Sequence, residues 1–355
     1  MSGYQIPHFG LKRQYKNLKD ELLDATDRAM KDGQLVNGHY TRSFEEWLKH
    51  KTRTRYAITV HSGTQALEII ARWKKIKHNE TMDGNPTVLI PNLTYPATLN
   101  AFVTAGWDVE LADTDKNGII VSGNRGGVYE CYMGYAGRKP RPATSYPESY
   151  GVIVDGAQHW LVVNGNVGSG MAISFDPTKN LNASGNGGAI VTNDEKLYLY
   201  ASSNRDNCKP YFHDVGTNSK MSEVDCAHLM VRIKYIDQWQ ERRQKIAEYW
   251  CDRFRELPIS CLSDTRDPHA HQKFVMYMPD RNSLMTHMVL NNIDCKRHYE
   301  YVLGDLPTAK DLVKPDMLST SVMLSRGVIS LPMYPELTDN EVEYIANKVD
   351  EYFGE

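Results

Sequence analysis

The sequence lacks the features that mark several classes of protein. No stretch approaches the ~18 consecutive apolar residues of a membrane-spanning helix, and the first residues contain no apolar core of a secretory signal. Its 41 basic and 44 acidic side chains give a formal charge of −3, whereas binding to nucleic acid or to an anionic membrane requires a basic excess. The sequence therefore predicts a cytoplasmic protein that binds neither nucleic acid nor membrane.

Cysteine and metal-binding patterns are also scarce. The six cysteines are scattered with no C-x-x-C pair, which favours free thiols. His269 and His271 stand close together, but no cluster of carboxylates or cysteines accompanies them, so we expect two exposed histidines and no metal. The glycine-rich residues 165–170 do not form G-x-G-x-x-G, which argues against a nicotinamide cofactor.

The remaining composition is that of a globular protein with a sizeable core. Of its 355 residues, 41% are hydrophobic and 24% are charged, and this length suggests two domains.

A first helix is expected over residues 12–30 with Gly33 as its stop. Ser43 and Glu46 form a capping box that would begin the next helix, and Asn164–Gly165 is a hairpin signal. Short β-rich segments alternate with helical or glycine-rich ones, at residues 57–60, 88–90, 109–111, 151–154 and 189–192.

That alternation predicts a mostly parallel sheet with helices on its faces. The pattern changes near Met221, where Ser222 and Asp225 cap a helix whose apolar spacing continues to Phe254, long enough to bend or to bridge two domains. A strand at residues 273–278, a helix at 282–291 and a last helix after a capping box at 338–341 follow. We expect a large α/β domain at residues 1–235, which includes the N-terminal helical segment 1–50, and a small α+β domain at 236–355.

Several segments carry residues suited to chemistry at strand ends. Asp155 ends an apolar strand, where ligands of open parallel sheets bind, although an acid there can also be a turn residue. Gly63, between a strand and a helix, would let a phosphate approach free N–H groups, but Ser62 and Gln65 also make an ordinary capping box.

The next two segments have equally plain alternatives. Ser174 and Lys179 stand five residues apart on one loop, and a buried lysine has the lowered pKa that Schiff-base chemistry needs; most loop lysines are simply solvated. Tyr95 could stack on a flat ring or only pack at an edge. Together the four segments supply a phosphate site, a stacking aromatic, an acid for a ring nitrogen and a Schiff-base lysine, which are the parts of a pyridoxal phosphate site.

In this order the motifs resemble the DegT/DnrJ/EryC1/StrS family of sugar aminotransferases over nearly the whole chain. The resemblance implies the fold of type I pyridoxal-phosphate-dependent transferases, with a seven-stranded, mostly parallel sheet between helices and a small C-terminal domain. The matching segments are residues 33–38, 44–45, 61–67, 91–98, 155–158, 174–180, 187–192 and 216–221, with Trp239, Arg242-Arg243, His298-Tyr299 and Leu331-Pro332.

The resemblance also implies the role of each matching residue. Lys179 would form the Schiff base with pyridoxal 5′-phosphate (PLP) and shuttle the proton, and Asp155 would pair with the ring nitrogen. The other roles are Gln158 at the ring hydroxyl, Tyr95 against the ring face, Gly63, Thr64 and Ser174 at the phosphate, Asn218 at the phosphate of the neighbouring subunit of a homodimer, and His298, Tyr299 and Arg205 near the substrate or the donor carboxylate. Arg205 is as well explained by a surface salt bridge.

The implied reaction moves an amino group, from glutamate by resemblance, to a nucleotide-linked 3-keto or 4-keto sugar. Asn182, Asn186 and Lys220 depart from the usual family pattern, as does the polar and aromatic stretch 129–139, and these departures leave the sugar open. Lysine at position 179 favours transamination, because members with histidine there are dehydratases. The alternatives are a transaminase of a cyclitol or another small ketone, and a catalytically silent homologue that regulates a partner.

Overall fold

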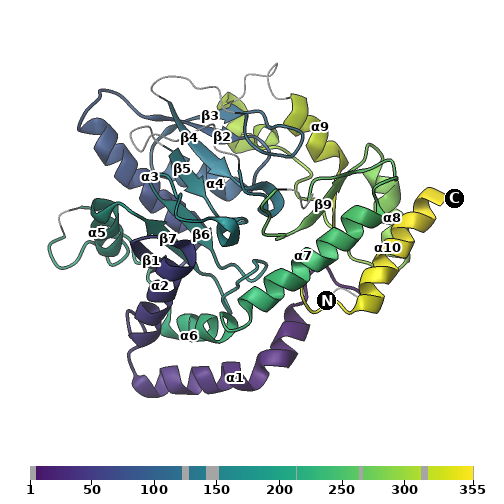
Figure 1. The fold of residues 1–355 in the computed structure, drawn as a ribbon. Helices are drawn as coiled ribbons and strands as arrows, with labels where there is room; N and C mark the ends of the chain where they lie inside the picture. Colours follow the sequence, from purple (N-terminus) through teal and green to yellow (C-terminus); the bar gives the residue numbers. More distant parts are fainter. Residues whose placement is uncertain are drawn as a thin grey trace.

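The computed structural model describes residues 5–121, 128–140, 152–212, 214–263, 267–312 and 319–354, in which two sheets are surrounded by helices (Figure 1). Gly151, which one predicted strand includes, lies outside these ranges. No helix within them is both long enough and apolar enough to cross a membrane.

The larger sheet has seven strands in the order β1-β7-β6-β5-β4-β2-β3. β7 is antiparallel to both of its neighbours, and the pairs from β6 to β3 are parallel, which confirms the mostly parallel sheet. Two of the strands were not predicted: β6, and β4, which mixes tyrosine and glutamate with apolar residues. The strands are β1 (Tyr56–Val60), β2 (Thr87–Pro91), β3 (Asp108–Ala112), β4 (Val128–Met133), β5 (Val152–Asp155), β6 (Met171–Ser174) and β7 (Gly188–Thr192).

Helices cover both faces of this sheet, and the alternation of side chains along each strand assigns them. Ile58 and Val60 of β1 join the apolar cluster that contains residues of α3, α4 and α5, whereas Ala57 joins the cluster with α2 and α6. The helices of this region are α1 (Leu11–Asp32), α2 (His39–Thr52), α3 (Gly63–Asn79), α4 (Pro96–Thr104), α5 (Glu195–Asn204) and α6 (Glu223–Arg232).

The start of α2 corrects the sequence expectation. The helix begins at His39 rather than after Ser43, which lies inside it. Its first N–H groups are capped from far along the chain: the Glu223 carboxylate accepts hydrogen bonds from the N–H groups of Gly38 (2.8 Å), Tyr40 (2.8 Å) and Thr41 (3.0 Å). A helix start stabilised by a remote residue leaves no local capping pattern to read.

The C-terminal part of the chain builds a second, three-stranded antiparallel sheet in the order β10-β9-β8. Its cluster of buried residues also takes in Ile6, which pairs with Ile293. The division of the chain at residue 235 stays a prediction. The elements are α7 (Ile236–Arg253), β8 (Ser260–Cys261), β9 (Phe274–Tyr277), α8 (Arg281–Leu290), α9 (Ser319–Gly327), β10 (Val328–Leu331) and α10 (Asp339–Gly354).

The long helix predicted after Met221 is two helices. Ser222 caps α6 as expected, with its hydroxyl 3.0 Å from the N–H of Asp225, and the chain turns between Arg232 and Ile236 before α7. In Figure 1 α6 lies below the larger sheet and α7 runs from it toward the smaller one. The turn explains how one apolar pattern serves two clusters.

Two smaller expectations were wrong. Asn164–Gly165 turns the chain without a hairpin, because the preceding residues form a 3-10 turn (Trp160–Val162) and the Gly165 N–H bonds to the Thr52 carbonyl at 2.9 Å. His269 and His271 are buried instead of exposed, with their rings stacked 4.4 Å apart. In both cases remote parts of the chain contact residues whose local sequence predicts an exposed position. The capping box of α10 is confirmed, since Thr338 and Glu341 bond each other's N–H groups.

Candidate active site

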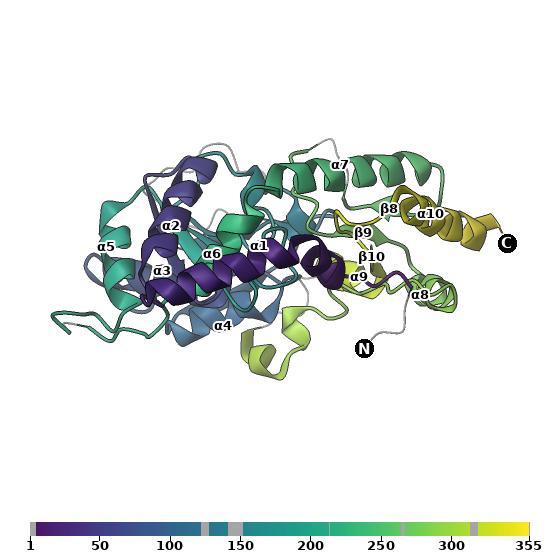
Figure 2. The ribbon, with the colours of Figure 1, turned by 90° about the horizontal axis from the view of Figure 1, so that it is seen from below.

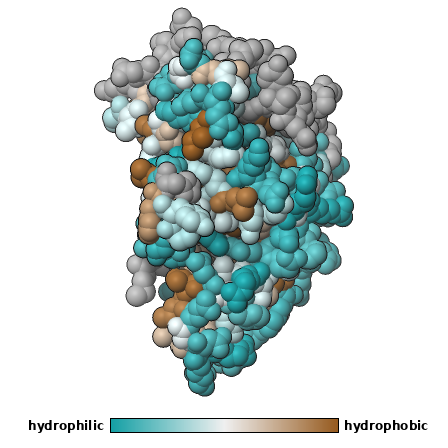
Figure 3. Space-filling view, turned by 90° about the vertical axis from the view of Figure 1, so that its left-hand side faces the viewer, coloured by the Kyte–Doolittle hydropathy of each residue, from teal (hydrophilic) through white to brown (hydrophobic). Residues whose placement is uncertain are grey.

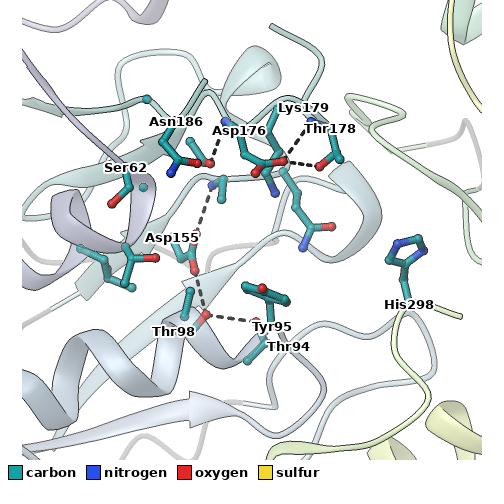
Figure 4. Close-up of a pocket in the computed structure, with 18 of the residues that line it drawn as sticks. Ser62, Thr94, Tyr95, Thr98, Asp155, Asp176, Thr178, Lys179, Asn186 and His298 are labelled. Atoms are coloured by element: carbon teal, nitrogen blue, oxygen red, sulfur yellow. Dashed lines mark hydrogen bonds between the residues drawn. The ribbon is translucent and has the colours of Figure 1, made fainter. Parts of the chain in front are cut away.

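A cavity of about 610 Å³ lies where strands of the larger sheet end. The loops that follow β1, β2, β5 and β6 line one side of it, which we call the cofactor side: residues 61–64, 94–98, 155–158 and 174–179. Phe9, Lys273, His298 and Tyr299 line the other side, which we call the donor side. Figure 4 shows Lys179, Asp155 and Tyr95 around the cavity, with Ser62 at one end and His298 at the other.

The Ser62 end of the cavity is the start of α3. Ser62 caps this helix by accepting the Gln65 N–H at 3.1 Å, and no described residue accepts a hydrogen bond from the N–H groups of Gly63 or Thr64. Glycine is required at position 63, because a Cβ there would lie 2.7 Å from the Ser174 Cβ. Free N–H groups at the positive end of a helix dipole bind anions such as phosphate.

Asp155 ends β5 with its carboxylate in the cavity and is held by two donors. The Thr98 hydroxyl donates to Oδ2 at 2.8 Å, and the Ala157 N–H donates to Oδ1 at 3.1 Å. Burial raises the pKa of Asp155, while these donors and the charge of Lys179 oppose the rise. A buried carboxylate with a fixed orientation is suited to receive a cationic N–H group.

Lys179 lies on the turn after β6 and extends into the same cavity. Asp176 rigidifies that turn: its carbonyl accepts the Lys179 N–H at 2.9 Å, and its carboxylate accepts the N–H and hydroxyl of Thr178 at 2.9 and 2.6 Å. Burial lowers the pKa of the Lys179 ammonium, against the attraction of Asp155 and Asp176. The amine is therefore neutral, and nucleophilic, at a lower pH than that of a free lysine.

Tyr95 and Gln158 also line the cofactor side of the cavity. The Tyr95 side chain is 58% exposed, and its ring centroid lies 6.1 Å from that of Tyr299. The Gln158 amide is oriented by its partners: its oxygen accepts from the Ala136 N–H (3.0 Å) and the Lys273 ammonium (3.2 Å), and its nitrogen donates to the Tyr299 hydroxyl (3.3 Å).

Nine of the residues singled out from the sequence line this one cavity, and two do not. Arg205 is held away from it by an ion pair with Glu45 (2.6 Å) and by the Thr59 carbonyl (2.8 Å). The salt bridge was expected at the surface, but both of its side chains are largely buried. Asn218 is exposed on the segment between α5 and α6, where Lys220 donates to it at 3.1 Å. The nine are Gly63, Thr64, Tyr95, Asp155, Gln158, Ser174, Lys179, His298 and Tyr299.

Sequence reasoning missed several residues of the cavity. Thr98 lies one turn into α4, and the spacing of Thr94, Tyr95 and Thr98 around a helix start is a signal that it shares a face with them. Lys273 stands at the start of a strand and lines the cavity as a second buried lysine. Phe9 arrives from the other end of the chain, and no local signal marks it.

These residues fit PLP. The free N–H groups of Gly63 and Thr64 suit its phosphate, the doubly held Asp155 carboxylate suits its ring nitrogen, and the exposed ring of Tyr95 suits its face. Lys179 adds the primary amine that a carbonyl cofactor requires.

Comparison with known proteins supports the same assignment. The DegT/DnrJ/EryC1/StrS aminotransferase family matches residues 16–124 and 151–350. The dTDP-3-amino-3,6-dideoxy-alpha-D-galactopyranose transaminase of Aneurinibacillus thermoaerophilus is 27% identical, over 98% of this chain and 99% of that protein. A protein of Geobacillus stearothermophilus named pleiotropic regulatory protein is 25% identical, over 98% of each chain.

A solved structure confirms the fold class. The crystal structure of S. venezuelae DesV in complex with a ketimine intermediate superposes with a TM-score of 0.91, at 24% identity and over 99% of both chains. The sequence motifs, the fold and the family match agree on an aminotransferase. The chain belongs to the DegT/DnrJ/EryC1/StrS aminotransferase family.

Proposed function

We propose that this protein is a PLP-dependent aminotransferase that moves an amino group from glutamate to a nucleotide-linked keto sugar. The observation that carries the proposal is the placement of Lys179 and Asp155 in one cavity whose far end is the free start of α3. A primary amine, an acid and an anion site in that arrangement match the carbonyl, ring nitrogen and phosphate of one cofactor.

Each residue of the cofactor side has a distinct task in this proposal. Lys179 would hold the cofactor covalently, Asp155 its ring nitrogen, Gln158 its ring hydroxyl and Tyr95 its face. Gly63, Thr64 and Ser174 would bind its phosphate. When bound, PLP supplies an electron sink for the bond that breaks at the donor carbon.

The protein's own groups then move the proton and orient the substrate. With its pKa lowered by burial, the Lys179 amine can accept the proton from Cα of the donor. It can deliver a proton to the carbon of the acceptor sugar that receives the amino group in the second half of the reaction. The Thr98 hydroxyl and the Ala157 N–H keep the Asp155 carboxylate aimed into the cavity. Holding the reacting groups in this geometry removes much of the entropic cost of their encounter.

The substrate class is drawn from the relatives. The A. thermoaerophilus relative is named for a dTDP-linked 3-amino sugar, which supports a nucleotide-linked keto sugar as acceptor and favours amination at C3 over C4. His298 lies at the end of the cavity opposite Ser62, and in this proposal it would contact the sugar together with Tyr299. The Nδ1 atom of His298 is already engaged by the Ser330 hydroxyl at 2.9 Å.

A homodimer with shared sites is part of the proposal, because Asn218 is assigned to the phosphate of the neighbouring subunit. The segment that carries Asn218 also exposes Tyr211, Phe212 and Val215, at 83%, 67% and 74%. Figure 2 shows this segment projecting from the side of the molecule beyond α5, and Figure 3 shows separate hydrophobic groups on that side. Sedimentation should give twice the mass of one chain, and a monomer would remove this part of the proposal.

The test of the function is direct amination. Purified protein loaded with PLP is incubated with glutamate and a panel of nucleotide-linked 3-keto and 4-keto sugars, and the aminated sugar is sought by mass spectrometry. Product with at least one of them is expected. A protein that turns over glutamate but aminates none of the panel would favour the cyclitol or small-ketone alternative.

The relative named pleiotropic regulatory protein supports a second candidate function, which is regulation. A catalytically silent homologue would bind a partner without chemistry. The presence of Lys179, Asp155 and Ser174 in one cavity counts against it. A protein that takes up PLP with no visible absorption change on addition of glutamate would support it.

A further inference from the structure

The donor side of the cavity contains a buried lysine amine with no carboxylate partner. The Lys273 side chain lines the cavity although the residue is only 6% exposed, and no ion pair joins it to any acid within the described residues. Its two neighbours are neutral amides, the oxygen of Gln158 at 3.2 Å and that of Gln272. In its ammonium form Lys273 has three donors, and these two amide oxygens are the acceptors that the described part of the chain supplies.

Lys273 lies beside the catalytic lysine rather than at the phosphate end. The Gln272 amide that accepts from Lys273 also donates to the Thr178 carbonyl at 3.0 Å, one residue before Lys179. The charge of Lys179 is felt at Lys273, where it adds to burial in lowering the pKa of Lys273. Burial is the main cause that lowers the pKa of His298 and of His8, and Lys273 adds to it, while Asp294 opposes it at His8. Asp176 opposes the lowering of the pKa of Lys273 but forms no ion pair with it. A buried charge without a partner is costly, so a carboxylate that arrives beside Lys273 would raise this pKa and pair with the ammonium form.

We propose that Lys273, held by the amides of Gln158 and Gln272, is the receptor for the α-carboxylate of the amino-acid donor. The inference rests on the proposed function only for the existence of such a donor. The donor nitrogen must reach the carbon to which Lys179 is joined, and its α-carboxylate is two bonds from that nitrogen. The receiving cation must therefore lie next to Lys179, as Lys273 does, and not at Gly63 and Thr64, which face the phosphate.

The test compares two donors that differ only in the α-carboxylate, glutamate and 4-aminobutyrate. For the PLP-loaded protein, the rate of amine donation divided by the donor Kd is measured in single turnovers from the visible absorption. Lys273→Met should lower this value for glutamate by about 10–100-fold, the usual contribution of a hydrogen bond to a charged group, and change it much less for 4-aminobutyrate. Lys273→Arg, which keeps the charge, should restore part of the loss for glutamate.

A binding measurement gives a readout apart from turnover. Glutarate, a dicarboxylate without an amine, is titrated into the PLP-loaded protein by calorimetry. Lys273→Met should weaken its binding by a similar factor, and Lys196→Met, at an exposed lysine of α5, should leave both binding and donation unchanged. Equal losses for glutamate and 4-aminobutyrate, or equal glutarate affinity with and without Lys273, would overturn the assignment. Failure to aminate any sugar, with the donor effect intact, would count against the proposed acceptor and leave Lys273 in its role.

Discussion

The two sides of the cavity are assembled in different ways. On the cofactor side every residue ends a strand of the larger sheet or lies in the segment that follows one, so hydrogen-bonded registers between neighbouring strands set their spacing. On the donor side Phe9, Lys273 and His298 come from segments that lie far apart in the sequence. Isolated backbone pairs, such as Ile6 with Ile293 and Lys296 with Ser330, bring these segments together. A sheet edge supplies a rigid frame for the cofactor, and remote segments add the groups that select the substrates.

The largest effect is expected at Lys179. Replacing it with alanine removes the amine that holds the cofactor and moves the proton, and we expect amino transfer to fall by about 10⁴-fold. The measurement is the rate of aminated-sugar formation, with folding checked by circular dichroism. Retention of more than a tenth of the activity would show that the chemistry does not occur on the cofactor side.

The next effect is expected at the partner of the ring nitrogen. Asp155→Asn should lower kcat by about 10²–10³-fold, the range for losing one preorganised electrostatic contact. Thr98→Val, which removes only the hydroxyl 2.8 Å from Asp155, should cost about 10-fold or somewhat more. If Thr98→Val were as damaging as Asp155→Asn, the threonine would have a role of its own in the reaction.

The contrast between local and remote contacts extends to folding. Glu223→Ala leaves three N–H groups at the start of α2 without their acceptor, and should lower the free energy of unfolding by about 2–3 kcal/mol. Ser43→Ala, at the expected local cap, should change it by less than about 0.5 kcal/mol. Both values come from urea unfolding. A larger loss for Ser43→Ala than for Glu223→Ala would show that Ser43, and not Glu223, stabilises the start of α2.

The smallest effect is expected from the ion pair that joins the first and last helices. Arg13 and Glu341 form two short hydrogen bonds, and Arg13 is the main cause that lowers the pKa of Glu341 to about 2 from its usual 4.5. Because the folded-state pKa is depressed, this stability is present above about pH 4.5 and is lost as the pH falls toward 2. The pair is partly exposed, so we expect about 1 kcal/mol. Glu341→Gln should remove that part of the acid dependence in unfolding titrations between pH 5 and pH 2.5, and an unchanged slope would show that the pair contributes nothing.

Much of the cofactor side could be predicted from the sequence, because its residues sit in short motifs at strand ends. Asp155 after an apolar strand, Gly63 before a helix and Lys179 five residues after Ser174 are patterns within a few residues of chain. The strand β4 was not predicted, since a buried strand of mixed sequence has no period to detect. The strand β6 was not predicted either, although it is as long as the predicted β5.

The donor side could not be predicted in the same way. Nothing near Lys273 marks it as buried beside another lysine, because its partners Gln158 and Lys179 lie about 100 residues earlier in the chain. The burial of His269 and His271 and the capping of α2 by Glu223 were missed for the same reason. His298 and Tyr299 were predicted by family resemblance alone. A family motif includes residues that meet only in the folded protein, whereas a local pattern does not.

The central claim is that Lys179, one of two lysines that line the same cavity, carries the cofactor. Reduction of the PLP-loaded protein with borohydride, followed by peptide mapping by mass spectrometry, locates the covalent link. The structure predicts the cofactor mass on the peptide that contains Lys179 and none on the peptide that contains Lys273. A link at Lys273, or no link at either lysine, would contradict the account.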